Sequence, residues 1–88
     1  MKIRQLKDSL LVAMTESEAE RVLTSISHWV RTLKVVGYPE AKPADIAALE
    51  RMEKLRIITM ERKGSKATVS LTKDGIELYQ EFLSRGYY

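Results

Sequence analysis

Basic side chains concentrate in one part of the chain, and they offer the clearest chemistry in the sequence. Between residues 51 and 73 there are seven Lys or Arg residues and two Glu residues. This local excess of five positive charges exceeds the net charge of +3 of the whole 88-residue chain, so the remainder is slightly acidic. Ammonium and guanidinium groups gathered in this way favour a polyanionic partner. An ordinary solvated surface is the alternative interpretation of the same charges.

Residue types suited to catalysis or metal binding are scarce. The chain has no cysteine and a single histidine, His28, so it offers neither a thiolate nucleophile nor a set of zinc ligands. It also lacks a glycine-rich phosphate loop and a histidine placed with a serine and an aspartate. We therefore expect no enzymatic activity, no cofactor and no metal ion. No apolar run is long enough to span a bilayer, so we expect no membrane partner and a cytoplasmic location.

Apolar residues spaced three and four apart predict two helices in the first part of the chain. The first is expected over residues 3–14. The second begins at one of two overlapping capping boxes, Thr15 with Glu18 or Ser17 with Glu20, and it ends at Gly37. Its apolar stripe comprises Ala19, Val22, Ile26, Trp29, Leu33 and Val36, widened by Leu23 and Val30.

A turn with two prolines, GYPEAKP at residues 37–43, precedes a third helix that begins near Pro43. The inner face of this helix holds Ile46, Leu49 and Met52. Its outer face holds small residues and then cations, namely Ala44, Ala47, Arg51 and Lys54. Small side chains let a helix approach a groove closely, and an arginine can pair with a guanine edge.

Residues 56–75, RIITMERKGSKATVSLTKDG, alternate with the period of a β-strand and predict a hairpin. Gly64 in its loop suits a tight turn with positive φ. A last helix is predicted over residues 73–85, with Ile76, Tyr79 and Leu83 on one face and Leu78 and Phe82 beside them.

Two short motifs in this order of elements resemble MarR- and PadR-like transcriptional regulators. Residues 51–58, RMEKLRII, are similar to the end of their recognition helix and the start of the first wing strand. Residues 71–75, LTKDG, are similar to the LT-x-x-G between the second wing strand and the next helix. The resemblance covers about residues 37–80. It implies an α+β, mostly helical, winged helix-turn-helix fold with three helices, a β-hairpin wing and a C-terminal helix.

The resemblance implies a single domain over residues 1–88, with the helix-turn-helix at about 17–56, the wing at about 57–72 and the C-terminal helix at about 73–85. It also implies a sequence-specific double-stranded DNA-binding regulator whose recognition helix enters the major groove while the wing contacts the backbone or the minor groove. The expected recognition-helix contacts are Lys42, Ala44, Ala47, Arg51 and Lys54. The expected wing contacts are Arg62, Lys63, Gly64, Ser65 and Lys66.

A homodimer is expected as well, because one such module buries only about 600–1,000 Å² on DNA. The resemblance places the dimer contacts in the helices at the chain ends, residues 3–14 and 73–85.

The sequence departs from the family pattern in three places. Arg56 stands where these regulators usually have glycine, so we expect the helix end to be capped differently. The turn at residues 37–43 is about two residues longer than usual. The wing tip, RKGSK, lacks the Asp-x-Arg often found in MarR wings.

Three alternatives remain open. Arg51 and Lys54 can pair with Glu50 or Glu53 along an exposed helix instead of contacting bases. The wide apolar stripe of the second helix favours a winged-helix module that binds another protein. The basic hairpin also suits double-stranded RNA or architectural binding without base contacts.

Overall fold

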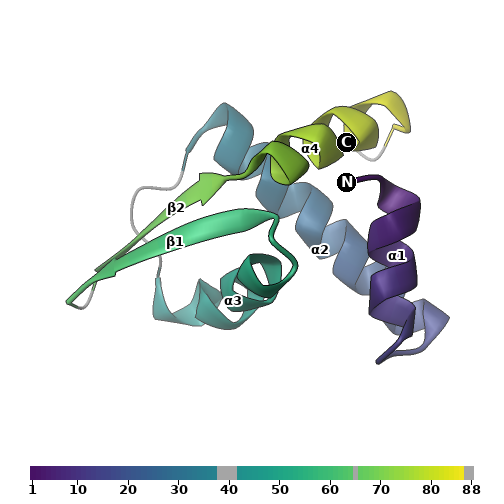
Figure 1. Ribbon diagram of the computed structural model, residues 1–88, viewed down its shortest axis with the longest axis horizontal. Coiled ribbons are helices and arrows are strands. Elements are labelled where there is room, and N and C mark those ends of the chain that lie inside the picture. The colour runs from purple at the N-terminus through teal and green to yellow at the C-terminus, as the bar shows by residue number, and fades with distance from the viewer. Residues whose placement is uncertain (38–41, 65, 87–88) are drawn as a thin grey trace.

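The computed structural model describes residues 1–37, 42–64 and 66–86. In chain order the elements are α1 (Ile3–Leu11), α2 (Glu16–Val35), a 3₁₀ turn η1 (Pro43–Asp45), α3 (Ile46–Lys54), β1 (Ile58–Lys63), β2 (Lys66–Leu71) and α4 (Lys73–Ser84). The described residues thus form an α+β fold of four α-helices and one antiparallel hairpin (Figure 1). This order agrees with the predicted one. The first helix ends at Leu11 rather than near residue 14, and part of the predicted proline turn lies outside the described residues.

Helix α2 begins at the first of the two predicted capping boxes. The Glu18 backbone N–H donates to Thr15 Oγ1 at 3.2 Å, and the Thr15 hydroxyl donates to Glu18 Oε1 at 2.8 Å. The Thr15 hydroxyl, together with the Thr15 backbone N–H, which donates to the same carboxylate oxygen at 3.3 Å, holds the pKa of Glu18 below its usual value. Glu20 of the other box instead forms an ion pair with Lys7 of α1 at 2.8 Å. At the far end Gly37 has a φ of +86°, which confirms the predicted glycine stop.

Side chains from all four helices and both strands meet in one buried cluster. The most deeply buried line of α2 is not the whole predicted stripe, because Val22, Trp29 and Leu33 lie only at its edge and Val36 is 80% exposed. The core residues of α2 are Ala19, Leu23, Ile26 and Val30.

The deepest burial in α4 falls on the two residues that the sequence analysis placed beside the face of Ile76, Tyr79 and Leu83. Leu78 and Phe82 are completely buried, whereas Ile76 is 38% and Leu83 is 49% exposed. Both sets have helical spacing, so apolar periodicity alone does not choose between them. The choice is made by Gly75, which lies on the buried side of α4 and brings that side against the rest of the chain.

The hairpin pairs Ile58 with Leu71 at its open end and Lys63 with Lys66 at its tip. Gly64, directly after β1, has a φ of +61°, as predicted for a tight turn. Met60 and Val69 are paired on the face that contributes to the core.

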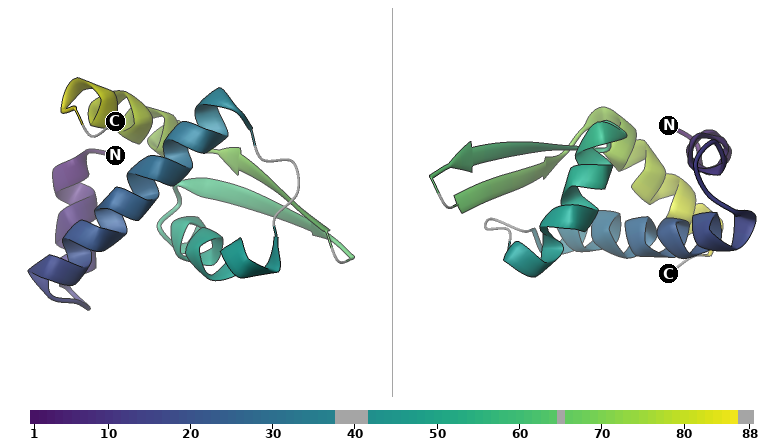
Figure 2. Two further views of the ribbon diagram at one scale, coloured as in Figure 1. Left: turned by 180° about the vertical axis from the view of Figure 1, so that it is seen from behind. Right: turned by 90° about the horizontal axis from the view of Figure 1, so that it is seen from below.

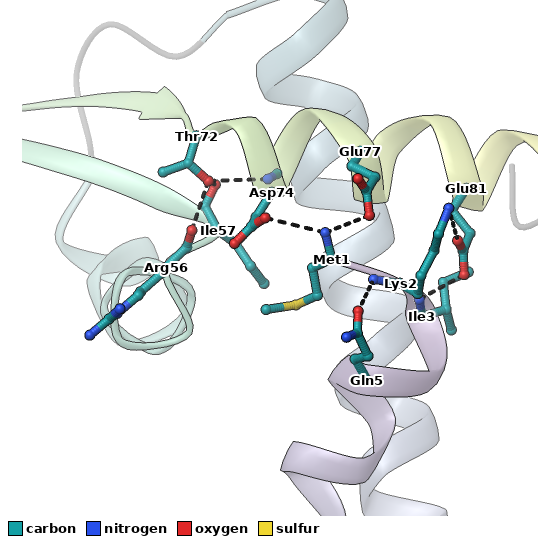
Figure 3. Close-up of polar contacts among 11 residues, drawn as sticks. Met1, Lys2, Ile3, Gln5, Arg56, Ile57, Thr72, Asp74, Glu77 and Glu81 are labelled. Atoms are coloured by element: carbon teal, nitrogen blue, oxygen red, sulfur yellow. Dashed lines mark hydrogen bonds and ion pairs between the residues drawn. The ribbon is translucent and has the colours of Figure 1, made fainter.

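The open end of the hairpin is closed by residues on either side of it, which we call the α3–α4 junction: Arg56, Ile57, Thr72 and Gly75 (Figure 3). The Thr72 hydroxyl donates toward the carbonyl oxygens of Arg56 at 2.7 Å and Ile57 at 3.0 Å. Its oxygen also accepts the Gly75 N–H at 3.1 Å, so Thr72 is the N-cap of α4. The Thr72 N–H donates to the Ile57 carbonyl at 3.0 Å. One side chain therefore joins the end of α3 to the start of α4.

Helix α1 is held against α4 by polar contacts at its first turn (Figure 3). Glu81, whose side chain is only 11% exposed, accepts the Ile3 backbone N–H at 2.7 Å. A carboxylate of α4 thus satisfies a backbone donor at the start of α1, which has no partner within α1 itself.

The Met1 ammonium lies 2.7 Å from Glu77 Oε1 and 3.3 Å from Asp74 Oδ1. Burial lowers the pKa of this ammonium, but the hydrogen bonds to Glu77 and Asp74 raise it further, so the pKa lies above its usual value of 8.0. The hydrogen bond from the ammonium lowers the pKa of Glu77.

Within the described residues, no helix combines the length and the apolar character needed to cross a membrane.

We expect Gly75→Ala to destabilise the protein, although Gly→Ala inside a helix usually stabilises by about 1 kcal/mol. A Cβ at residue 75 would overlap the Ile57 carbonyl oxygen and lie 2.9 Å from Leu71 Cδ2. Such overpacking against backbone should cost about 2 kcal/mol and lower Tm by roughly 10 °C in thermal unfolding. Gln80→Ala, at an exposed position of the same helix, is the control with little expected change. A stabilised Gly75→Ala variant would contradict the close approach.

We expect the stability lost in Glu77→Gln to depend on pH on both sides of neutrality. A depressed carboxyl pKa stabilises above the unfolded value of 4.5, and this contribution is lost as the pH falls through the folded pKa. A raised ammonium pKa stabilises below 8.0, and this contribution is lost as the pH rises through the folded pKa. Urea unfolding of wild type and variant should therefore differ most between these values. Glu61→Gln, at an exposed hairpin position, is the control; an unchanging difference from acid to alkali would exclude the ion pair.

Candidate nucleic-acid interface

The outer face of α3 carries the residues that the sequence predicted for base contacts. Ala47, Arg51 and Lys54 are exposed and line one shallow depression together with Glu50. The opposite face is buried through Leu49 and Met52, so the predicted division of this helix into two faces is confirmed.

The segment before α3 differs slightly from the prediction. The helix expected to begin near Pro43 starts as the short 3₁₀ turn η1, and the α-helix itself begins at Ile46. Ala44 lies within η1 and Lys42 is its N-cap residue; both are exposed.

The ion pairs of α3 differ from the alternative in which Arg51 and Lys54 pair with Glu50 or Glu53 of the same helix. Glu53 lies 3.2 Å from the Arg62 guanidinium of β1 rather than beside a cation of its own helix. Among residues 1–37, 42–64 and 66–86, neither Arg51 nor Lys54 forms an ion pair. Both cations are therefore presented to solvent.

The basic residues of the hairpin divide between its two faces. Lys63 and Lys66 are directly opposite each other at the tip and both are exposed. Arg62 pairs with Ala67 on the other face, which is the face that packs against the core, and this alternation directs its guanidinium to Glu53. The predicted wing contacts thus form two sets, with Lys63, Gly64 and Lys66 at the exposed tip and Arg62 turned toward α3. Ser65 lies outside the described residues.

The hairpin projects beyond the helices, and α3 lies beside β1 (Figures 1 and 2). In all three views η1 lies on the side of α3 nearer the hairpin tip. The Glu53–Arg62 ion pair joins these two elements directly. Helix α3 and the hairpin are therefore in direct contact along β1.

The end of α3 is capped differently from the expectation drawn from the sequence. Arg56 has a φ of +62°, the left-handed conformation that favours glycine. The Arg56 N–H donates to the Glu53 carbonyl at 2.9 Å and the Ile57 N–H donates to the Met52 carbonyl at 3.0 Å. This pair of hydrogen bonds is a Schellman motif, the usual glycine-type helix end. The expectation of a different cap is therefore wrong. The helix ends with the same backbone geometry that a glycine would adopt, and arginine takes up this left-handed conformation at a cost of about 1 kcal/mol.

Two basic residues near this surface were missed as site residues. Arg21 of α2 lines an open groove with Ser25 and Arg51 of α3. Its position on an exposed helix face, thirty residues before Arg51, gives no sequence signal for this proximity. Arg56 was noted only as a departure from a motif, although its exposed side chain adds a cation at the end of α3.

No group of acidic, histidine or cysteine side chains suited to hold a metal ion occurs in the described part of the chain. Comparison of the chain with protein families, with curated proteins and with solved structures gives no match.

We expect the coupling between Glu53 and Arg62 to be small but measurable. The two side chains are 35% and 51% exposed, and solvent-exposed ion pairs contribute about 0.2–1 kcal/mol. A double-mutant cycle with Glu53→Ala, Arg62→Ala and the double variant, measured by urea unfolding at low salt, should give a value in this range. The coupling should fall in about 1 M salt. A coupling of zero at low salt would show that the ion pair does not connect α3 and the hairpin in solution.

Proposed function

We propose that this protein binds double-stranded DNA in the manner of a winged helix-turn-helix regulator, with α3 in the major groove and the β1–β2 hairpin as the wing. The observation that carries the proposal is the pairing of Glu53 with Arg62. This contact joins the hairpin to α3 and neutralises an acidic group between them. Exposed cations remain on both elements, at Arg51 and Lys54 of α3 and at Lys63 and Lys66 of the tip.

The two elements have different tasks in this proposal. Lysines at the tip neutralise phosphates and release counterions, which provides affinity independent of sequence. The face of α3 provides base contacts, since Arg51 can form a bidentate pair with guanine and Ala47 can contact a thymine methyl group. Lys42, at the start of η1, is placed for a further phosphate contact, and Ala44 allows close approach.

A homodimer belongs to the same proposal. Two modules related by a two-fold axis would read two half-sites and double the small area that one module buries. Apolar side chains left exposed on α4, Ile76 and Leu83, support a contact through the last helix.

We expect Lys63→Ala/Lys66→Ala to weaken binding to a mixed-sequence DNA duplex and to reduce its salt dependence. The slope of log Kobs against log salt should become shallower by roughly 1.8, or 0.9 for each phosphate that the variant no longer neutralises. Fluorescence anisotropy with a labelled duplex measures this slope. The charge-matched control is Lys2→Ala/Arg4→Ala at the start of α1, which lies away from the hairpin (Figure 1). Arg62→Ala should change the slope less than Lys63→Ala, because its guanidinium already contacts Glu53.

Equal slopes for the wild type and the hairpin variant would remove the wing from DNA binding. No binding of the wild type at low salt would contradict the proposal as a whole. It would favour the second candidate function, a winged-helix module that binds another protein. That candidate is supported by Val35 and Val36 at the end of α2, which are 64% and 80% exposed.

A further inference from the structure

We propose that Arg56 is a phosphate-binding residue at the end of α3, retained there at the expense of stability. The proposal rests on the DNA-binding function proposed above and adds a contact that neither the predicted recognition-helix residues nor the predicted wing residues include. It follows from one contradiction in the structure: a residue with a long charged side chain occupies a backbone conformation that favours glycine.

The backbone at this position is determined by its surroundings rather than by the arginine. The Schellman hydrogen bonds require a left-handed residue between Leu55 and Ile57. The Arg56 carbonyl is in addition held by the Thr72 hydroxyl at 2.7 Å. Glycine would meet both requirements without strain, so the arginine side chain must be explained by something other than the fold.

The side chain of Arg56 makes no polar contact in the described part of the chain that would offset the strain of its backbone. Arg56 is exposed, and no ion pair or side-chain hydrogen bond of its guanidinium occurs there. Figure 3 shows the side chain directed away from Thr72 and from α4, beside the end of α3. A strained residue with an unused functional group is typical of binding sites.

The position of Arg56 favours a nucleic-acid phosphate over an acidic protein as the partner. Arg56 follows Lys54 by two residues, so it adds a cation just beyond the end of the helix that carries Arg51 and Lys54. The planar guanidinium can hold a phosphate through two parallel hydrogen bonds. Because the carbonyl of Arg56 is anchored to Thr72, the side chain starts from a fixed point beside α3.

The test compares two substitutions that separate strain from charge. Arg56→Gly removes both the left-handed strain and the guanidinium. Arg56→Lys keeps the strain and the charge but lacks the planar fork. Arg4→Ala removes an exposed arginine from α1 and serves as the control for net charge. Thermal unfolding is measured in about 0.3 M salt, which screens the attraction between a cation and the end of a helix. Binding to a mixed-sequence duplex is measured as a function of salt.

We expect Arg56→Gly to raise Tm by a few degrees while weakening DNA binding several-fold. Its log–log salt slope should become shallower by about 0.9, the value for one phosphate. Arg56→Lys should keep the wild-type slope and Tm with a modest loss of affinity, and Arg4→Ala should bind like the wild type.

Opposite outcomes separate this inference from the function on which it rests. If the wild type binds DNA and Arg56→Gly binds equally well, the inference about Arg56 is wrong while the proposed function stands. A lower Tm for Arg56→Gly would overturn the inference as well, because arginine would then be needed by the fold. If the wild type binds no duplex but an acidic polypeptide such as poly-glutamate in an Arg56-dependent manner, both proposals fail in favour of a protein partner.

Discussion

The position of the hairpin depends on the Thr72 hydroxyl. This group contacts the carbonyls of Arg56 and Ile57 on one side and the Gly75 N–H on the other, all within 3.1 Å. It adds to the hydrogen bond from the Thr72 N–H to the Ile57 carbonyl and to the burial of Ile57 and Ile58 in the core, which also hold the open end of the strands. The absence of a Cβ at Gly75 completes the arrangement, since it lets α4 start directly against the Ile57 carbonyl. The orientation of α3 relative to the hairpin, on which any DNA-binding geometry depends, is therefore determined at the α3–α4 junction.

A second contact between α3 and the hairpin, an ion pair, lies nearer the hairpin tip. Glu53 and Arg62 connect α3 to β1 several residues from the α3–α4 junction, so the helix and the hairpin are joined at two points. Helix α1 is attached independently, through the Ile3 N–H on Glu81 and the Met1 ammonium on Glu77, both carboxylates of α4. The surface that would meet DNA and the surface that packs α1 consequently lie on different parts of the fold, and changes in one need not disturb the other.

Much of the fold could be predicted because its signals are local. Gly37, Gly64 and the Thr15–Glu18 box act within a few residues, and the structure contains each of them. The errors concern choices that depend on distant residues. The buried side of α4 could not be chosen from periodicity, because Gly75 acts through its approach to Ile57, eighteen residues earlier. Arg62 was grouped with Lys63 and Lys66 by proximity in sequence, although strand alternation and the position of Glu53 turn it toward α3. Arg56 is the exception, because its left-handed backbone follows from hydrogen bonds to the nearby Glu53 and Met52 carbonyls, and the error arose from the absence of the usual glycine.

The resulting charge pattern bears on how such a surface would discriminate between DNA sequences. Glu50 stands beside Arg51 and Lys54 on the outer face of α3, and Glu61 lies on the hairpin near its basic tip. Acidic groups close to phosphates oppose non-specific binding, so the affinity of this surface for arbitrary DNA should be modest. When the affinity for arbitrary DNA is modest, base contacts contribute a larger share of the total affinity. Specificity is the difference between the binding free energies for the specific site and for arbitrary DNA. A cation at the end of α3, such as Arg56, would then gain importance, since it would anchor the helix on the DNA backbone without placing more charge along the face proposed to meet the bases.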